Sequence, residues 1–143
     1  MIPVAPARPH TDAVVAALQV ADVAVGRGEK PPGAGYQGQD QNSQHIPYAV
    51  LFPTPGTPDG NVAEPYEYLD YTVQATCVGA TQEGAEALAD MVKVALVGQR
   101  LAIAGRSSYR GELLVDRPAT RDDTVVPPEH YAVLQIRWRT QST

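Results

Sequence analysis

The sequence predicts an α+β fold, in which an antiparallel sheet of about four main strands carries two helices on one face and long loops join the elements. The first observation is an alternation of apolar and polar residues from Tyr66 to Val78, which gives a strand one apolar and one polar face. The second is a helical repeat of apolar residues from Thr81 to Val97. The third is another alternation, from Tyr131 to Thr140. A two-layer packing buries the apolar side of each element.

The central strand and the helix after it have clear boundaries. Thr81 can accept a hydrogen bond from a free backbone N–H and so cap the start of the helix. Gly98 suits the left-handed conformation that often ends a helix. Within the helix, Leu88 and Val92 are expected to face the apolar side of the strand. Alternate positions of that strand are apolar: Leu69, Tyr71, Val73, Ala75 and Cys77.

Proline and glycine divide the N-terminal third of the chain. Prolines space residues 1–10, which are therefore expected to form an extended arm. Thr11 or Asp12 can begin a first helix that continues to Ala21. Residues 26–45 begin with two glycines, which are expected to end regular structure, and are rich in glycine and amide side chains. Because such a segment buries little apolar area, we expect a flexible loop.

Two further stretches complete the expected sheet. Ile46 to Phe52 is typical of a strand, with Phe52 among its buried residues, and the proline- and glycine-rich turn after it favours antiparallel pairing with the central strand. Glu112 to Arg117 is expected to form a strand that Pro118 ends. Gln99 to Ile103 is short and apolar, so only a fragment of strand is expected there. The 143 residues, 1–143, are expected to form a single domain.

The composition argues against several function classes. Eleven basic and 16 acidic residues give a formal charge of −5, whereas a nucleic-acid-binding protein needs a basic surface to neutralise phosphates. Cys77 is the one cysteine, so no internal disulfide forms and a reducing compartment is expected. No stretch approaches the roughly 20 apolar residues that span a bilayer, and no signal peptide is recognised, so neither a membrane partner nor secretion is expected.

The sequence offers little for chemistry. The three histidines, His10, His45 and His130, lie far apart and are expected at the surface rather than in a metal site, which needs clustered ligands. Asp122-Asp123 has the ligand type that a hard cation prefers, but an adjacent pair beside Arg121 is more often a solvated turn. No phosphate-binding loop is present. We therefore expect no catalytic, metal or cofactor-binding residues, no cofactor and no enzymatic activity.

The order of these segments resembles the tail terminator proteins of long-tailed (siphovirus-type) phages that infect actinobacteria. The resemblance covers Asp12 to Thr140 and rests on order and spacing rather than on a catalytic signature. The glycine- and amide-rich insert GAGYQGQDQNSQ departs from it, because it is longer and more polar than the family leads one to expect. The segments that carry it are DAVVAALQVADVAVG, PYAVLFPTPG, YTVQATCVGATQEGAEALADMVKVAL, LAIAGR and RDDTVVPPEHYAV, followed by the final arginine-bearing strand.

The resemblance implies a structural protein of the virion tail or neck, assembled in the host cytoplasm. Such a protein forms a homohexameric ring on the end of the tail tube, stops tube polymerisation and presents a surface to a head-tail connector or stopper protein. DNA only passes through the lumen. Three alternatives stay open. The first is another neck or head-completion protein, and the second is a small-ligand-binding α+β module, which a deep apolar pocket would favour. The third is a hydrolase or transferase, which would need a perturbed acid–base pair that the sequence does not reveal.

Charge and aromatic character mark candidate contact residues for the ring or the tail tube. A charged loop ahead of Pro127-Pro128 stands between two strands, and two arginines share the polar face of the last strand, opposite Trp138. Tyrosine is amphipathic and enriched at protein interfaces. The candidates are Arg121, Asp122, Asp123, Arg137, Arg139 and Tyr36.

Overall fold

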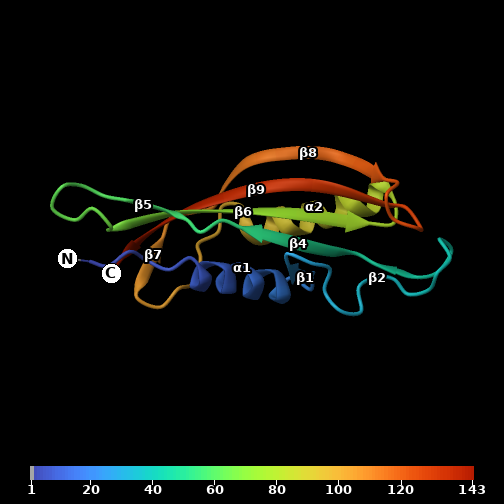
Figure 1. Ribbon diagram of the computed structural model, residues 1–143, viewed down its shortest axis with the longest axis horizontal. Helices are drawn as coiled ribbons and strands as arrows, with labels where there is room; N and C mark the ends of the chain where they lie inside the picture. The colour runs from blue at the N-terminus through green and yellow to red at the C-terminus, as the bar shows by residue number, and fades with distance from the viewer. Residues whose placement is uncertain (1) are drawn as a thin grey trace.

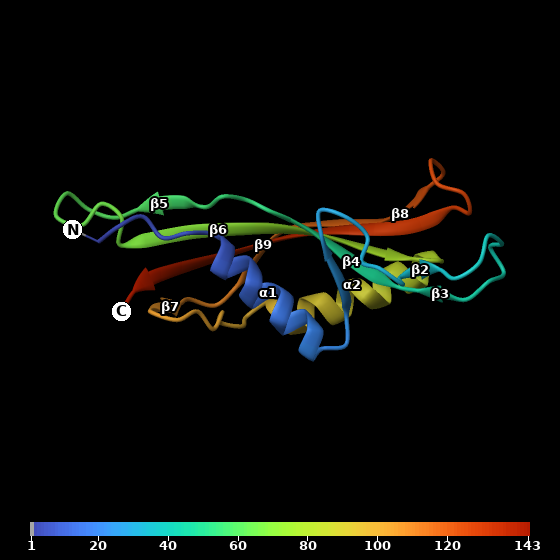
Figure 2. The same ribbon diagram turned by 60° about the horizontal axis from the view of Figure 1, so that its bottom comes forward.

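A seven-stranded sheet runs along the long axis of the structure, a computed structural model that describes residues 2–143. Both helices lie against the same face of this sheet (Figures 1 and 2). The chain ends lie close together at one end of the molecule (Figure 1). The strands of the sheet are β1 (Ala24–Arg27), β4 (Tyr48–Pro53), β5 (Thr57–Asp59), β6 (Tyr68–Gly79), β7 (Arg106–Ser108), β8 (Glu112–Asp122) and β9 (Glu129–Ser142).

The predicted α+β class is confirmed. Its four main strands are β4, β6, β9 and β8, which lie side by side in that order and pair antiparallel. The sheet is nevertheless mixed, because β1 pairs parallel with β4, with Ala24 opposite Tyr48. The expectation that regular structure ends at the glycines near residue 26 is therefore wrong. Gly26 lies within β1, where a Cβ atom would stand 2.0 Å from the carbonyl oxygen of Glu29, so this glycine permits a close approach rather than a break.

Helix α2 (Gln82–Leu96) has the predicted limits. The Thr81 side chain accepts a hydrogen bond from the backbone N–H of Gly84 at 3.0 Å. Gly98, two residues past the helix, has the left-handed φ of 75°. The helix packs on β6 and β9, and Leu88 and Val92 lie in the same core as the apolar side of β6, as predicted.

Helix α1 (Arg8–Val20) begins earlier than predicted. Pro9 lies in the first turn, where a missing N–H removes no helical hydrogen bond. The predicted extended arm of residues 1–10 is thus too long, and the described part of it covers residues 2–7. Thr11 caps nothing. It is buried, and its hydroxyl lies 2.6 Å from the Tyr71 hydroxyl on β6.

The core lies between the helices and the covered face of the sheet. Alternate residues of β6 and β9 are buried there, as their periodicity predicts, and Val14 and Leu18 of α1 join them. The rings of Tyr71 and Trp138 lie 6.3 Å apart at the centre of this layer. Cys77 is fully buried in the same core.

His10 contradicts the expectation of three surface histidines, because it is fully buried. Its Nδ1 lies 3.1 Å from the carbonyl oxygen of Pro6, and its Nε2 lies 2.7 Å from the hydroxyl of Thr140. Arg106 donates from Nε to that same hydroxyl oxygen at 2.9 Å. These partners fit a neutral ring, with Nδ1–H donating to Pro6 and Nε2 accepting from Thr140. Burial, and then the Arg106 charge, lower the pKa of His10.

Two strand details differ from the prediction. Phe52 is 46% exposed, because it shares the uncovered face of the sheet with Val50 but lies beyond the small cluster of Ala34, Tyr48, Val50 and Val78. Strand β8 continues through Pro118 to Asp122. The pairing with β9 shifts register between Arg117 and Thr120, so Pro118 sits at an irregularity of an edge strand, where its missing N–H breaks no ladder.

The predicted flexible loop contains regular structure. Strands β2 (Gly35–Tyr36) and β3 (His45–Ile46) pair antiparallel, and Gln37 donates a backbone hydrogen bond to Gln44 at 2.8 Å. Its mobility remains a prediction. The fragment after α2 is not a strand, although Ile103 forms one isolated bridge with Arg106. Neither helix within residues 2–143 is long and apolar enough to cross a membrane.

Candidate functional site

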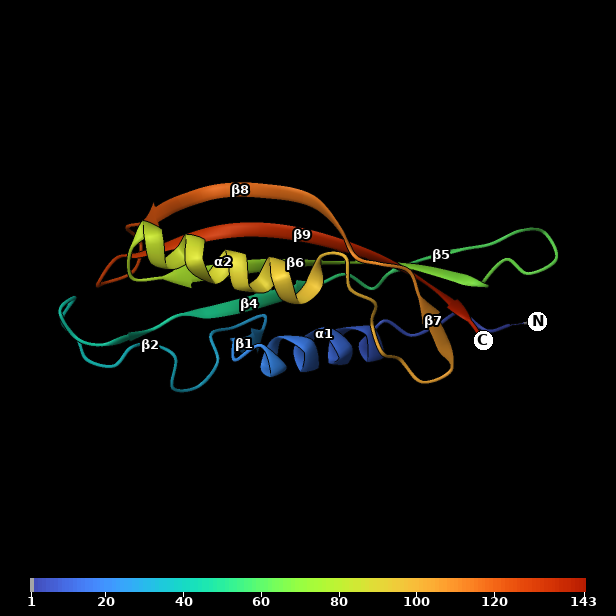
Figure 3. The same cartoon turned by 180° about the vertical axis from the view of Figure 1, so that it is seen from behind.

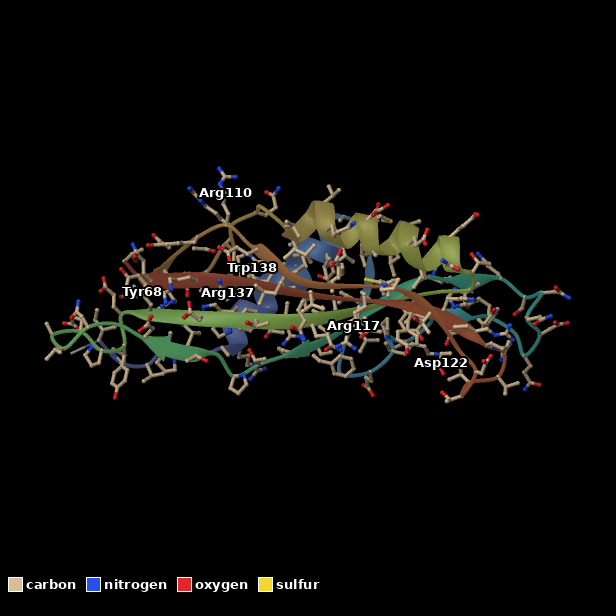
Figure 4. The ribbon with its side chains drawn as sticks, turned by 90° about the horizontal axis from the view of Figure 1, so that it is seen from above. Tyr68, Arg110, Arg117, Asp122, Arg137 and Trp138 are labelled. Atoms are coloured by element: carbon tan, nitrogen blue, oxygen red, sulfur yellow. The ribbon has the colours of Figure 1, made fainter. Side chains whose placement is uncertain are left out.

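The helices leave one face of the sheet uncovered, and the polar residues of β6 and β9 lie on it. We call this surface the open face. In Figure 4, Tyr68 and Asp122 lie towards opposite ends of the sheet, with Arg137 and Arg117 between them. Its central residues are Asp70, Thr72, Gln74 and Thr76 of β6 and Gln135, Arg137 and Arg139 of β9, which stand opposite one another in the antiparallel ladder.

Arg139 is held by three neighbours. Its Nε donates to Asp70 at 2.7 Å and a terminal nitrogen donates to the second oxygen of Asp70 at 2.9 Å, which forms a bidentate pair. The same guanidinium bonds to Asp59 of β5 and lies 4.9 Å from the centroid of the Tyr68 ring. The hydrogen bond from Arg139 lowers the pKa of Asp70. Arg139 therefore ties β5, β6 and β9 together at one end of the sheet.

Arg137 lies next to Arg139 on the open face. It donates to the carboxylate of Glu112 on β8 at 2.7 Å, and both side chains are about half exposed. A polar cleft of about 170 Å³ separates the two arginines from the chain after β7. Its lining residues are Asp70, Tyr109, Arg110, Glu112, Arg137 and Arg139. Because cations and carboxylates alternate in it, this cleft suits a polar, charged protein contact more than an apolar ligand.

The predicted charged loop lies at the opposite end of the sheet and is partly strand. Arg121 and Asp122 are the last residues of β8, and Asp123 stands in the turn to β9. Arg121 pairs with Asp123 at 2.6 Å, with both side chains well exposed. Asp122 accepts hydrogen bonds from the backbone N–H of Thr124 at 2.9 Å and from its hydroxyl, and these lower the pKa of Asp122. The three residues thus hold the shape of this turn.

Tyr36 lies near this charged turn. Its hydroxyl donates to the carbonyl oxygen of Pro128 at 3.3 Å, and its ring stands edge-on to His45, with centroids 4.7 Å apart. A groove of about 240 Å³ includes both Tyr36 and Arg121 in its lining. The structure therefore brings Tyr36 together with the charged turn, whereas Arg137 and Arg139 form a separate group.

The expectation of a surface histidine is also wrong for His45, which belongs to a buried polar group at the same end of the sheet. His45 Nε2 lies 2.7 Å from the Glu129 carboxylate, and both side chains are largely buried. The Tyr48 hydroxyl donates to the same carboxylate at 3.3 Å, and burial raises the pKa of Tyr48. These contacts tie β3 and β4 to the start of β9. The residues that make these contacts are more than 80 positions apart, so no local sequence pattern predicts the group.

The groups to consider for chemistry are acidic, histidine and cysteine side chains that could hold a metal ion, and the thiol of Cys77. Within residues 2–143, no three His, Cys, Asp or Glu side chains are grouped so that they could hold a metal ion. Burial raises the pKa of the Cys77 thiol to about 12, so it stays protonated and packs as a core residue. What the surfaces do offer is exposed apolar side chains at the tips of connections, including Val62 between β5 and β6 and Val126 between β8 and β9.

Comparisons with known proteins bear on the fold. No protein-family model matches the chain, and no curated protein matches it significantly. A chain of the virion of a native gene transfer agent (GTA) particle has a similar structure, with a TM-score of 0.61 and 20% identity over 88% of this chain and 84% of that one. A second solved structure, known only by a sequence identifier, has a TM-score of 0.50 and 16% identity over 93% and 96% of the two chains. The chain therefore shares its fold with a component of a gene transfer agent virion.

Proposed function

We propose that this chain is a structural protein of a virion, and that it acts there as a tail terminator. In this role, six copies form a ring on the end of the tail tube, end its polymerisation and present the surface that joins the head. The observation that carries the proposal is the fold shared with a gene transfer agent virion chain along 88% of the sequence. The order and spacing of the sequence segments point to the same class.

The shape of the molecule suits a ring subunit. A ring needs two unlike flanks on each copy, because each contact joins one flank to the opposite flank of a neighbour. The elongated sheet has two such flanks, formed by β1 on one side and β8 on the other. Its two ends carry the β5–β6 connection and the β8–β9 turn (Figure 1), which are free to meet partners along the ring axis.

The partners follow from this role. They are five further copies of the chain, the tail tube protein, and a connector or stopper protein on the head side. DNA passes through the lumen, and the formal charge of −5 suits a channel to which DNA must not adhere. The protein would be found in the tail or neck of the virion after assembly in the host cytoplasm.

Electron microscopy of particles tests the proposal. Infection by a phage that lacks this gene should yield overlong tails that lack heads, and supplying the intact gene from a plasmid should restore tails of uniform length. Tails of normal length that lack heads would favour the neck or head-completion alternative. Tails of normal length joined to filled heads would overturn the assignment.

A further inference from the structure

One connection of the fold carries charges of a single sign. Residues 99–111, which join α2 to β8 and include β7, contain Arg100, Arg106 and Arg110 but no acidic residue. The whole chain, by contrast, has a formal charge of −5. Within residues 2–143, none of these three arginines forms an ion pair. We call residues 99–111 the arginine segment. Figure 3 shows it running, with β7, to the end of the molecule where both termini lie.

Hydrogen bonds to β9 and between its own ends hold the arginine segment in shape. The Gly111 N–H and the Trp138 indole N–H both donate to the carbonyl oxygen of Gln99, at 2.8 and 3.0 Å. The Arg106 guanidinium donates to the hydroxyl and the carbonyl oxygen of Thr140, at 2.9 Å each. Trp138 and Thr140 are fully buried. The segment is thus ordered before any partner arrives, which lowers the entropy cost of binding one.

The other two arginines of the segment face solvent. Arg100 and Arg110 are exposed, and Tyr109 beside them is 50% exposed. Arg110 donates to the carbonyl oxygen of Gly98 at 3.0 Å, and Figure 4 shows it at the outer margin of the molecule, beyond Trp138. A recess of about 480 Å³ lies on this surface. Its lining residues are Arg100, Ser107, Ser108, Tyr109 and Arg110.

Arg110 differs from the two arginines of the open face, with which it shares the cleft of about 170 Å³. Each carboxylate in the lining of that cleft is already bonded to an arginine. The pairs are Arg137 with Glu112 and Arg139 with Asp70. Arg110 and Arg100 have no such partner within residues 2–143. Their guanidinium groups are therefore available to a carboxylate from outside the chain.

Resting on the proposed function, we propose that the arginine segment binds an acidic protein surface on the axial partner, the protein that contacts this end of the ring along its axis. Carboxylates of that partner meet Arg100 and Arg110, and Tyr109 packs against the partner beside them. Arginine and tyrosine are enriched among the residues that dominate binding energy at interfaces. A planar guanidinium can bind a carboxylate through two parallel hydrogen bonds. The partner's contact surface is thus rich in Asp or Glu side chains.

A DNA backbone fits this surface less well than a protein does. Duplex DNA carries one negative charge for about every 1.7 Å of its axis, so a DNA-binding surface needs an extended run of cations. Here the two exposed arginines adjoin a cleft in which cations and carboxylates alternate, and the chain as a whole is acidic. Two isolated guanidinium groups match a few separate carboxylates better than a continuous line of phosphates.

Attachment of the full-length protein to isolated virion parts tests the inference. The variant combines Arg100→Glu with Arg110→Glu, and the probes are tail tubes and filled heads from a phage that lacks this gene. Each probe is mixed with purified protein and sedimented. The variant should fold and assemble as the unchanged protein does, while its affinity for one of the two probes falls on the order of tenfold or more. The affected probe identifies the axial partner at this end.

Two further variants serve as controls. Arg100→Lys with Arg110→Lys keeps both charges and should lose no more than about threefold in affinity. Lys30→Glu with Arg117→Glu makes the same change in net charge at two residues outside the arginine segment that also form no ion pair in the described chain. This control should attach as the unchanged protein does. An equal loss in it would show that net charge, and not this segment, governs attachment.

The outcomes separate this contact from the proposed function. If the unchanged protein binds tubes or heads and the Arg100→Glu, Arg110→Glu variant binds them equally well, the inference fails and the tail-terminator role stands. If the unchanged protein binds neither probe, both fail. A short DNA duplex is a third probe. Retardation of the duplex by the unchanged protein but not by the variant, with equal attachment to tubes and heads, would assign the segment to DNA phosphates instead.

Revertants give an independent test of the partner's chemistry. Phages that carry Arg100→Glu with Arg110→Glu are selected for restored plaque formation. Second-site changes should replace an Asp or Glu of a tube or neck protein by Lys or Arg, because the exchange of charges restores the pair. Second-site changes elsewhere in this chain would make another copy the occupant and overturn the assignment.

Discussion

The two faces of the sheet follow different physical rules. On the covered face, β6 and β9 place apolar side chains, together with Tyr71 and Thr140, against the helices, and nearly all of them are fully buried. On the open face, the same two strands place polar side chains opposite one another in the ladder, and Arg139 pairs with Asp70 there. Successive residues of one strand point to opposite faces, so neighbouring residues in the sequence have different roles. One stabilises the core, and the next is available for surface contacts.

This difference divides the molecule into a part that folds and a part that meets partners. Changes on the covered face leave a cavity or an unpaired polar group, so they act on the free energy of unfolding. Exposed charges on the open face, the flanks and the ends contribute little to that free energy. If the protein works by assembly, their effects should appear in rings and tails.

The largest effect should come from truncation of the covered core. Leu88 is 4% exposed and packs on β6, so Leu88→Ala should lower the free energy of unfolding by roughly 2–5 kcal/mol. Val94, on the same helix, is 78% exposed, and Val94→Ala should change it by less than about 0.5 kcal/mol. Denaturant melts measure both, and equal losses would show that the two sides of α2 do not differ as described.

A smaller effect should come from the one histidine of the covered layer. The pKa of His10 in the folded protein lies below the ordinary value of 6.5, so the unfolded chain takes up the proton first as the pH falls. The stabilisation that comes from keeping His10 neutral is complete above pH 6.5 and is lost progressively below it. His10→Gln should lower the free energy of unfolding by about 1–3 kcal/mol at about pH 8, because it disturbs the bonds to Pro6 and Thr140.

The pH dependence distinguishes titration from simple damage. Between about pH 7.5 and about pH 5.5, the free energy of unfolding of His10→Gln should fall less than that of the unchanged protein. Val14→Ala truncates a buried neighbour in the same helix. It should lower the free energy of unfolding at every pH and leave its pH dependence the same as in the unchanged protein. If His10→Gln and the unchanged protein lost stability in parallel over this range, His10 would not be neutral in the folded state.

The sequence predicted the covered face well, because periodicity reports burial on one side of an element. Strands β6 and β9 are paired on both edges and covered on one face, so their alternation is strict. Strands at the edges were misjudged from local signals. Gly26 and Pro118 resemble breakers, yet β1 continues past Gly26 and β8 continues past Pro118, because pairing with a long neighbour outweighs the local preference.

The candidate site was predictable only as a set of residue types. The charged residues near Asp122 and on β9 are indeed exposed or partly exposed, but their partners are distant in the chain. Arg139 pairs with Asp70, 69 residues away, and His45 pairs with Glu129, 84 residues away. His10 was expected at the surface because the three histidines lie far apart in the chain. Such contacts depend on strand register, which a single sequence does not specify.

A modest effect on stability should come from the clamp on the open face. Arg139→Lys keeps the charge but loses the bidentate geometry with Asp70 and the shared bond to Asp59. We expect a loss on the order of 1 kcal/mol, because the pair is partly exposed. Since the pKa of Asp70 is lowered in the folded protein, this contribution is present above the ordinary carboxylate range and disappears as the pH falls through the folded value.

The clamp can be checked by hydrogen exchange. In Arg139→Lys, backbone amides of β5 and the start of β6 should exchange faster, whereas those of α2 should keep their protection. Arg137→Lys is the control, because Arg137 makes a single ion pair with Glu112 at a more exposed position. Faster exchange throughout the molecule would contradict a local clamp.

The smallest effect on stability, and the sharpest test of the comparison, should come from the charged turn at the end of the sheet. Changing Arg121, Asp122 and Asp123 together to alanine should leave the free energy of unfolding nearly unchanged, because the polar partners of these surface side chains are one another and Thr124. Ring formation or tail-length control should nevertheless be disturbed. The control Arg121→Lys with Asp123→Glu keeps both charges and should leave tails normal.

Loss of rings in the triple variant would show that the turn is a contact between copies. Intact rings on tails of irregular length would show that it is a contact with the tube. If the triple variant forms normal rings and gives tails of uniform length, the turn belongs to neither interface.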